Sequence, residues 1–386
     1  MTTATRLRPG SVFDGEPLLR TIATAVMVLS RRRTPGEPVY DAVVQRAFDQ
    51  LVLLCMRRRL PPPGSVPEMS RWARTLPLSR WPLDLSGAEV TDVDFLVDAL
   101  TGTPTQACLE WALSTSDPTA EQFENLVMHD AIGTCRAAQS PESYTALRRL
   151  LIERPVLSTA QLAELAAETD LHPVLELVKK CYEPAQASYL RDRRYATCAR
   201  CGCLLVPVTG QRLRCELDRC KRDGANLVSA LLDPHTGGGI HHLRRPLRVF
   251  VTGPGLAEID LERGLIKLGL RPEMWPNYDA YDLRVGLPNG QVWAIDVKDR
   301  ANPALLGRTT TAFRSTPAYT NAFLVVPAYR LTDREDYKRV FARNLPDDLR
   351  GRVVLRSDKA ILAKARTELA RARRDGATSG QGDERA

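Results

Sequence analysis

Apolar residues recur at intervals of three and four through most of the first 190 positions, which is the spacing of helices with one buried face. We therefore expect a mostly helical N-terminal domain over residues 1–190. The pattern predicts helices at Leu18–Arg31, Val39–Arg59, Asp92–Leu100, Cys108–Leu113, Ala120–Met128 and Pro141–Glu153. Residues 157–178 predict two further short helices, which we interpret as ordinary helix packing, with a helix-turn-helix module as the alternative.

The pattern changes to alternation between Tyr281 and Lys298, which predicts two short strands. Pro288-Asn289-Gly290 has the composition of a three-residue hairpin loop whose glycine takes the left-handed conformation. This loop sets the register, so that the large apolar side chains share one face and Asp282 lies opposite Asp296 on the other. Lys298 follows Asp296 by two residues and therefore lies on the same polar face.

Two carboxylates that lie this close repel each other unless a cation neutralises them, and oxygen ligands suit Mg²⁺ or Mn²⁺. We expect Asp282 and Asp296 to bind such an ion together with the carbonyl oxygen of Val297. The ion would activate a water for phosphodiester hydrolysis, and Lys298 would position that water and offset phosphate charge. The alternative is a solvated face on which Asp296 and Lys298 form a weak surface ion pair.

These residues resemble the PD-(D/E)xK superfamily of restriction-endonuclease-like nucleases, whose motif is an aspartate, a spacer and then (D/E)xK. Asp282, Asp296 and Lys298 match its three positions. The order of the following elements also matches, because a second core helix is predicted at Asn302–Ser315 and a strand at Ala322–Pro327. The similarity covers the C-terminal part of the chain.

The resemblance implies an α/β core over residues 240–375, with a mixed sheet flanked by helices, and the activity of a Mg²⁺-dependent deoxyribonuclease. Members often add a glutamate from the helix before the hairpin. Glu258 or Glu262 in the predicted helix after Gly255 would take that role. The alternative for both is an ordinary glutamate on the solvent-facing side of a helix.

A second group of candidate ligands lies upstream, in the predicted zinc ribbon at residues 191–236. Cys198 and Cys201 form one close pair, and Cys215 and Cys220 form another. Such spacing is typical of a structural Zn²⁺ site, in which four thiolates leave no open position for water. Other arrangements stay open, with free thiols or with a ligand contributed by Cys203, His235, His241 or His242.

The combination of a helical region, a ribbon and a terminal nuclease core resembles more narrowly the restriction-endonuclease-like protein of pPIWI-RE defence systems. This likeness covers roughly Tyr195 to Asp358. It implies a role in bacterial defence against phages or plasmids. It also implies two partners, a prokaryotic PIWI protein and a helicase.

The formal net charge of +8 favours an anionic partner such as nucleic acid, with general surface charge as the alternative. The nuclease resemblance implies that this partner is DNA. Arginines around the ribbon, with Tyr189 and Tyr195 among them, predict phosphate contact and base stacking, and a solvated arginine surface is the alternative. A basic helix at residues 359–374 is predicted to lie along a duplex or to be simply solvated. Residues 376–386 are predicted to form a disordered tail.

Nine cysteines, five of them within residues 198–220, favour metal binding in a reducing cytoplasm over a disulfide framework. The apolar run Ile22–Leu29 is too short to cross a bilayer, so we expect a cytoplasmic protein without a membrane anchor. Two further function classes stay open. The chain would be a nuclease-like subunit that binds nucleic acid without cutting it, or a zinc-ribbon transcriptional regulator.

Overall fold

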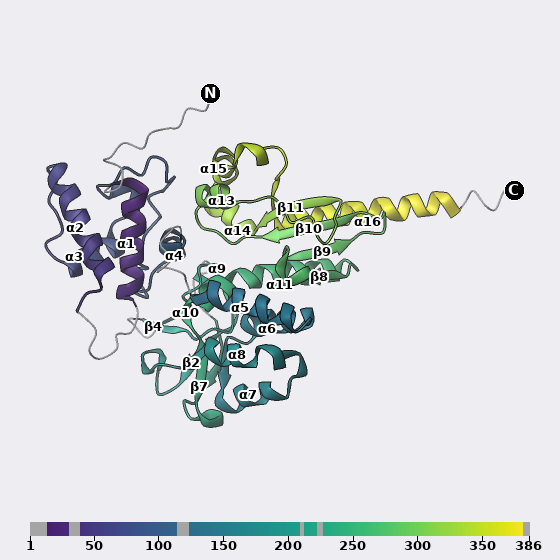
Figure 1. Cartoon of the computed structure of the whole chain (residues 1–386), viewed down its shortest axis with the longest axis horizontal. Helices are drawn as coiled ribbons and strands as arrows, with labels where there is room; N and C mark the ends of the chain where they lie inside the picture. The colour runs from purple at the N-terminus through teal and green to yellow at the C-terminus, as the bar shows by residue number, and fades with distance from the viewer. Residues whose placement is uncertain (1–13, 31–38, 114–122, 209–211, 222–226, 381–386) are drawn as a thin grey trace.

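The computed structural model describes residues 14–30, 39–113, 123–208, 212–221 and 227–380 (Figure 1). The helices are α1 (Gly15–Leu29), α2 (Ala42–Arg57), α3 (Val66–Thr75), α4 (Gln106–Leu113), α5 (Phe123–Ala137), α6 (Pro141–Glu153), α7 (Thr159–Glu164), α8 (Leu175–Cys181), α9 (Asp218–Lys221), α10 (Arg245–Leu247), α11 (Gly253–Lys267), α12 (Pro276–Asp279), α13 (Pro303–Thr309), α14 (Ala328–Asp333), α15 (Tyr337–Asn344) and α16 (Asp358–Gly380). The strands are β1 (Val156–Ser158), β2 (Tyr182–Pro184), β3 (Tyr195–Cys198), β4 (Val206–Val208), β5 (Arg212–Arg214), β6 (Val228–Leu232), β7 (Ile240–Leu243), β8 (Pro272–Met274), β9 (Leu283–Gly286), β10 (Val292–Val297), β11 (Asn321–Val326) and β12 (Leu355–Ser357). The chain is therefore a mixed α/β protein, as predicted.

The N-terminal part is helical, and α1 packs against α2 and α4. The Asp14 side chain caps α1 by accepting a hydrogen bond from the Gly15 amide, and fully buried residues such as Leu18 and Ile22 line its inner face. The prediction of a helix at Asp92–Leu100 is wrong. That segment forms turns, because the carboxylates of Asp94 and Asp98 accept backbone N–H groups nearby instead of leaving them to a helix.

The C-terminal part is built on a five-stranded mixed sheet in the order β12-β11-β10-β9-β8. Strand β10 pairs antiparallel with β9 and parallel with β11. The predicted hairpin register is confirmed, because Trp293 pairs with Val285 and Ile295 pairs with Leu283. The turn also forms as predicted, with Gly290 at a φ of 82°.

Helices cover both faces of this sheet. Helices α11 and α16 contact each other and the strands, and they share a core with Trp293 and Ile295. Helices α13 and α15 pack around a separate cluster that includes Leu324 and Phe341. In Figure 1, α11 lies on one side of β9 and β10, and α13 to α15 lie on the other. Successive side chains along β10 point to opposite faces of the sheet, so Asp296 lies on the opposite face from Ile295.

The middle of the chain joins the two parts. Strand β7 lies between β1 and β2 in a three-stranded sheet, so residues at the start of the predicted nuclease domain pair with the N-terminal region. The glycine run before β7 is held against α7, because Thr159 donates from its amide to Gly239 and from its hydroxyl to Gly238. The glycine run therefore connects β6 to β7 as a segment that is hydrogen-bonded to α7.

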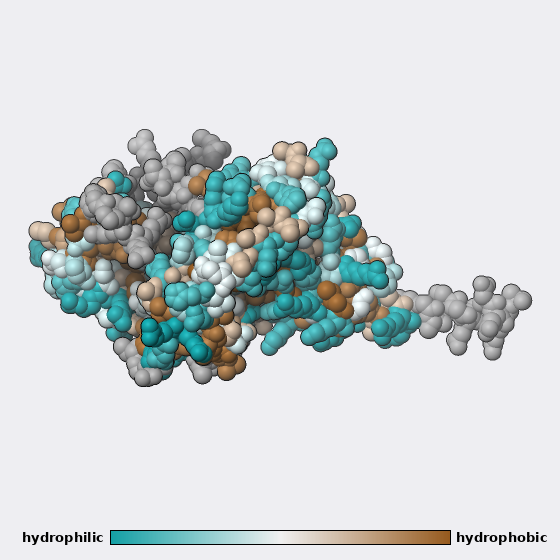
Figure 2. Space-filling view, turned by 90° about the horizontal axis from the view of Figure 1, so that it is seen from below, coloured by the Kyte–Doolittle hydropathy of each residue, from teal (hydrophilic) through white to brown (hydrophobic). Residues whose placement is uncertain are grey.

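Helix α16 projects away from the rest of the molecule (Figure 1). Its first turns pack on the core through Ile361 and Ala365, and it continues to Gly380, into the segment predicted as a tail. Residues 381–386 lie outside the described residues. Polar residues cover most of the face shown in Figure 2, with apolar residues in small patches. In the part of the chain that the structure describes, no helix is long and apolar enough to cross a membrane.

Candidate acidic site and cysteine cluster

The hairpin brings Asp282, Asp296 and Lys298 together. Lys298 Nζ lies 2.6 Å from Asp296 Oδ1 and 3.7 Å from Asp282 Oδ2. The backbone fixes this geometry, because the Val297 amide donates to Asp282 Oδ2 at 2.6 Å and the Lys298 amide donates to the Val325 carbonyl at 2.7 Å. The side chain of Asp282 is almost fully buried, whereas Asp296 and Lys298 are partly exposed.

The two aspartates have different electrostatic environments. Burial raises the pKa of Asp282 well above its usual value, and the nearby Glu258 carboxylate raises it further. Burial is the largest influence on Asp296 and acts to raise its pKa, but the Lys298 ammonium, hydrogen bonds from Asp282 and Lys298, and the Arg148 charge together lower it. Desolvation lowers the pKa of Lys298, and the Asp282 and Asp296 carboxylates more than offset this, so the lysine stays protonated. With both aspartates ionised, the pair would carry more negative charge than Lys298 balances, and the raised pKa of Asp282 reflects this repulsion.

Glu258 and Glu262 are buried in α11, so the solvent-facing alternative is wrong for both. Arg148 Nη2 donates to both oxygens of Glu258, at 2.8 and 3.1 Å, and Trp275 Nε1 donates to Glu258 Oε2 at 2.6 Å. Glu262 instead pairs with Arg149, one turn further along α11. Glu258 is one of the groups that raise the pKa of Asp282 most strongly.

Asp279 is a fourth acidic residue of the site, and the sequence analysis missed it. Its Oδ2 accepts a hydrogen bond from the Tyr144 hydroxyl at 2.9 Å and lies 3.6 Å from Arg148 Nη1. Its other oxygen, Oδ1, is buried without a hydrogen-bond partner. Asp279 ends a run with left-handed backbone angles, with φ of 50° at Asn277, 56° at Tyr278 and 69° at Asp279. The only local signal is the Pro-Asn-Tyr-Asp composition, which is typical of turns.

The chain after Lys298 is braced by the N-terminal helix α4. Glu110 accepts hydrogen bonds from the amides of Ala301 and Asn302, at 2.7 and 3.0 Å. Asp299 is buried against Arg330, whose Nε lies 2.6 Å from Asp299 Oδ1. These contacts fix the backbone on the far side of Lys298, so helices distant in sequence hold both flanks of the acidic site.

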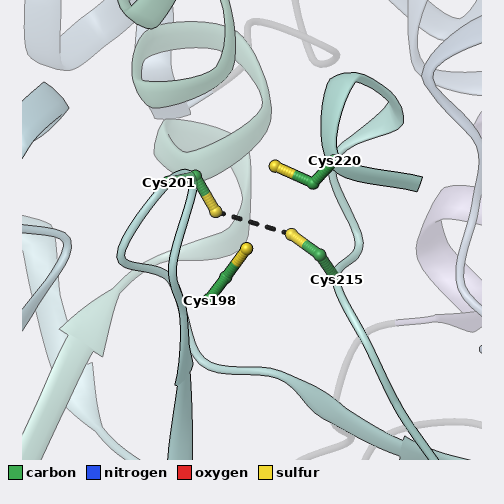
Figure 3. Close-up of side chains that lie close together, drawn as sticks. All are labelled: Cys198, Cys201, Cys215 and Cys220. Carbon is green, nitrogen blue, oxygen red and sulfur yellow. Dashed lines mark hydrogen bonds between the residues drawn. The ribbon is translucent and has the colours of Figure 1, made fainter. Parts of the chain in front are cut away.

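The four predicted cysteines converge from two segments (Figure 3). All their Sγ atoms lie within 4.8 Å of one another, and all four side chains are buried. The Sγ atoms of Cys201 and Cys215 are 3.5 Å apart, which is too long for a disulfide. Their thiols hydrogen-bond to Cys198 and lower its pKa, which favours the thiolate that a metal binds. This cluster could hold a metal ion.

The alternative ligands lie outside this cluster. Among the described residues, the group that could hold a metal contains neither Cys203 nor any histidine. His242 is buried beside Arg248, and desolvation lowers its pKa to about 3, so its ring is neutral. The expectation that Tyr195 stacks on bases is wrong, because its ring is buried and its hydroxyl donates to the Ala185 carbonyl.

Two family models match the chain. Residues 18–158 match the model described as pPIWI_RE three-gene island domain Y, and residues 255–373 match the model described as REase associating with pPIWI_RE. We call these segments the Y region and the REase region. No curated protein and no solved structure matches the chain. The REase region contains the acidic site, and the Y region contains the helices that brace it. The chain therefore belongs to the restriction-endonuclease-like proteins of pPIWI-RE defence systems.

Proposed function

We propose that this protein is a metal-dependent endonuclease that hydrolyses DNA phosphodiester bonds and acts in defence together with the other proteins of its gene island. The juxtaposition of Asp282, Asp296 and Lys298 within the REase region carries this proposal. Support also comes from the order of α11, the β9–β10 hairpin, α13 and β11, which is the element order of a PD-(D/E)xK core. The match to pPIWI-associated domains supports action beside a PIWI protein, and we include a helicase as the second partner.

The acidic site fits Mg²⁺ or Mn²⁺ because it offers carboxylate oxygens, and because the neighbouring carboxylates that raise the pKa of Asp282 repel one another in a way that a cation would relieve. Asp282 and Asp296 would hold the ion, with the Val297 carbonyl as a third ligand. A bound ion lowers the pKa of a coordinated water and polarises the scissile phosphate.

The chain's own groups then have separate roles. The Val297 amide orients the Asp282 carboxylate by hydrogen bonding. Lys298 lies close to both aspartates, where its ammonium would orient the attacking water and offset charge on the phosphate. Glu258 would assist through its charge, which acts on Asp282, whereas Glu262 pairs with Arg149.

We assign a structural Zn²⁺ to Cys198, Cys201, Cys215 and Cys220. Four thiolates in a closed cluster match the ligand set of structural zinc and leave no position for a catalytic water. This metal would hold the segments around β3 and α9 together. Helix α9 in turn contacts α11, because Arg219 pairs with Asp260 at 2.6 Å. The zinc site would thereby support the helix that carries Glu258.

Cleavage assays with matched variants test the nuclease proposal. Asp296→Asn and Lys298→Met remove the groups that would bind the ion and orient the water, so we expect cleavage to fall at least about 100-fold while DNA binding is kept. Asp348→Asn and Lys338→Met change exposed residues of the same region and should cleave like the wild type.

The substrates are plasmid DNA, single-stranded DNA and RNA, each with Mg²⁺, Mn²⁺ or a chelator, with and without the PIWI protein. Equal cleavage by wild type and Asp296→Asn would refute the assignment. Binding of DNA without cleavage under every condition would favour the adaptor alternative.

A further inference from the structure

A residue from the Y region lies inside the acidic site of the REase region. Arg148, on α6, binds both oxygens of Glu258 and lies 3.6 Å from Asp279. Its guanidinium also lies 5.1 Å from the centre of the Trp275 ring. Trp275 is tied to the site as well, because its amide donates to the Asp282 carbonyl at 2.8 Å.

Close packing of two helices puts Arg148 in this position. A Cβ atom at Gly255, on α11, would lie only 2.4 Å from the side chain of Ile152, on α6, so the absence of a side chain lets the helices approach. Arg148 is 10% exposed and Glu258 is 4% exposed, so solvent screens their interaction little. The ion pair is therefore an interior contact between the two regions.

The formal charges of the site match the charge of one divalent cation. When all four carboxylates are ionised, as a bound metal would require, the site has four negative and two positive side chains and a formal net charge of −2, from Glu258, Asp279, Asp282, Asp296, Arg148 and Lys298. One Mg²⁺ or Mn²⁺ would balance that charge. Arg148 thus offsets one of the two negative charges of Glu258 and Asp279, and Lys298 offsets one of the two of Asp282 and Asp296.

We propose that Arg148 is a positioning residue of the nuclease site, which holds Glu258 and Asp279 out of the metal's ligand set so that the ion binds at Asp282 and Asp296. This inference rests on the proposed function. Both oxygens of Glu258 already accept hydrogen bonds, from Arg148 and Trp275, which is the arrangement expected of a restrained carboxylate. The Y region would therefore complete the catalytic centre of the REase region.

The expected effect of Arg148→Gln differs from that of simple structural damage. Removing the guanidinium changes the net charge from −2 to −3 and frees Glu258, so Mn²⁺ should bind about tenfold more tightly. The same change draws the ion away from Asp282 and Asp296, so cleavage should fall at least about tenfold. Damage to the fold would instead weaken both.

Titration calorimetry with Mn²⁺ on the full chain tests the inference. Arg149→Gln is the matched control, because Arg149 is the next residue on α6, pairs with Glu262 on the same α11 and is 35% exposed. It should change Mn²⁺ affinity less than twofold. The double variant Arg148→Gln/Glu258→Gln restores the net charge to −2, so its Mn²⁺ affinity should return to the wild-type value.

The Mn²⁺ affinities of these variants can also contradict the proposed role of Arg148. Weaker or unchanged Mn²⁺ binding by a folded Arg148→Gln variant would overturn the inference. If that variant does not fold, the double variant decides, since lost Mn²⁺ binding would show that Glu258 is itself a ligand. Asp296→Asn separates the two proposals. If this variant binds Mn²⁺ as tightly as the wild type, Asp296 is not a metal ligand and the proposed nuclease site is wrong, whatever Arg148→Gln does.

Discussion

Asp282 and Asp296 have the same functional group but different tasks in the free protein. Asp282 is buried and lies near Glu258, so it is the carboxyl that protonates more readily. Asp296 has the shorter contact to Lys298, at 2.6 Å, and stays ionised. A bound cation would compete with a proton at Asp282 and with the Lys298 ammonium at Asp296. The free site is therefore held in an electrostatically unfavourable state that a divalent ion relieves.

Replacement of Asp282 by Asn should stabilise the metal-free protein at neutral pH. The folded-state pKa of Asp282 is raised above its unfolded value, so its stabilising contribution is present below the usual carboxyl range and is lost as pH rises through the folded pKa. Asparagine stays neutral and avoids that loss. Thermal unfolding in a chelator should give Asp282→Asn a midpoint a few degrees above wild type near pH 8, with a smaller gap near pH 4.

Addition of Mn²⁺ should reverse this order, because only the wild type gains a ligand carboxylate. A lower midpoint for Asp282→Asn at both pH values in the chelator would contradict the prediction. It would mean that the attraction between Asp282 and Lys298 exceeds the cost of burying the aspartate.

Local pattern was sufficient for three residues of the acidic site and insufficient for the rest. Strand alternation and the hairpin loop place Asp282, Asp296 and Lys298 on one face, and the structure brings them together. Asp279 depends on a run of left-handed residues, which alternation does not encode. Arg148 reaches the site through tertiary packing of α6 on α11, so no local signal in the sequence indicates its position.

Secondary-structure elements were predicted well where the residues that begin and end a helix agree with the hydrophobic period between them. Helix α6 has the predicted bounds Pro141–Glu153, since proline begins it and Pro155 follows its end. Helix α13 is shorter than predicted and ends at Thr309. Strands β8 and β12 have three residues each, too few for a hydrophobic period, and they form because the sheet supplies partners on one side.

Loss of a single cysteine of the cluster should release its metal. Cys215→Ser removes one of four converging thiols, so we expect zinc to fall from about one atom per chain to near zero, with a lower unfolding midpoint. Cys203→Ser is the matched control, because Cys203 is equally buried but lies outside the group. Elemental analysis of the purified proteins measures the metal content. Zinc loss in Cys203→Ser with retention in Cys215→Ser would reassign the ligands.

At the scale of the whole molecule, the Y region braces the acidic site from two directions. Helix α6 places Arg148 among the carboxylates, and α4 places Glu110 against the backbone that follows Lys298. A further contact joins Arg308, in α13, to Glu16, which lies in α1 just before the Y region. The matched segments are thus two parts of one packed structure, and the REase region depends on groups supplied by the Y region.

Replacement of Glu110 by Gln tests this dependence at a residue outside the acidic site. The carboxylate accepts two amides through different oxygens, and a glutamine offers only one acceptor oxygen, so one buried N–H loses its partner. We expect a loss of about 1–3 kcal/mol in local stability. Hydrogen exchange at residues 299–303 should become faster, and cleavage should fall because Lys298 is less firmly held. Glu335→Gln, at an exposed position, should change neither. Unchanged exchange at residues 299–303 in Glu110→Gln would mean that the REase region holds this backbone without the Y region.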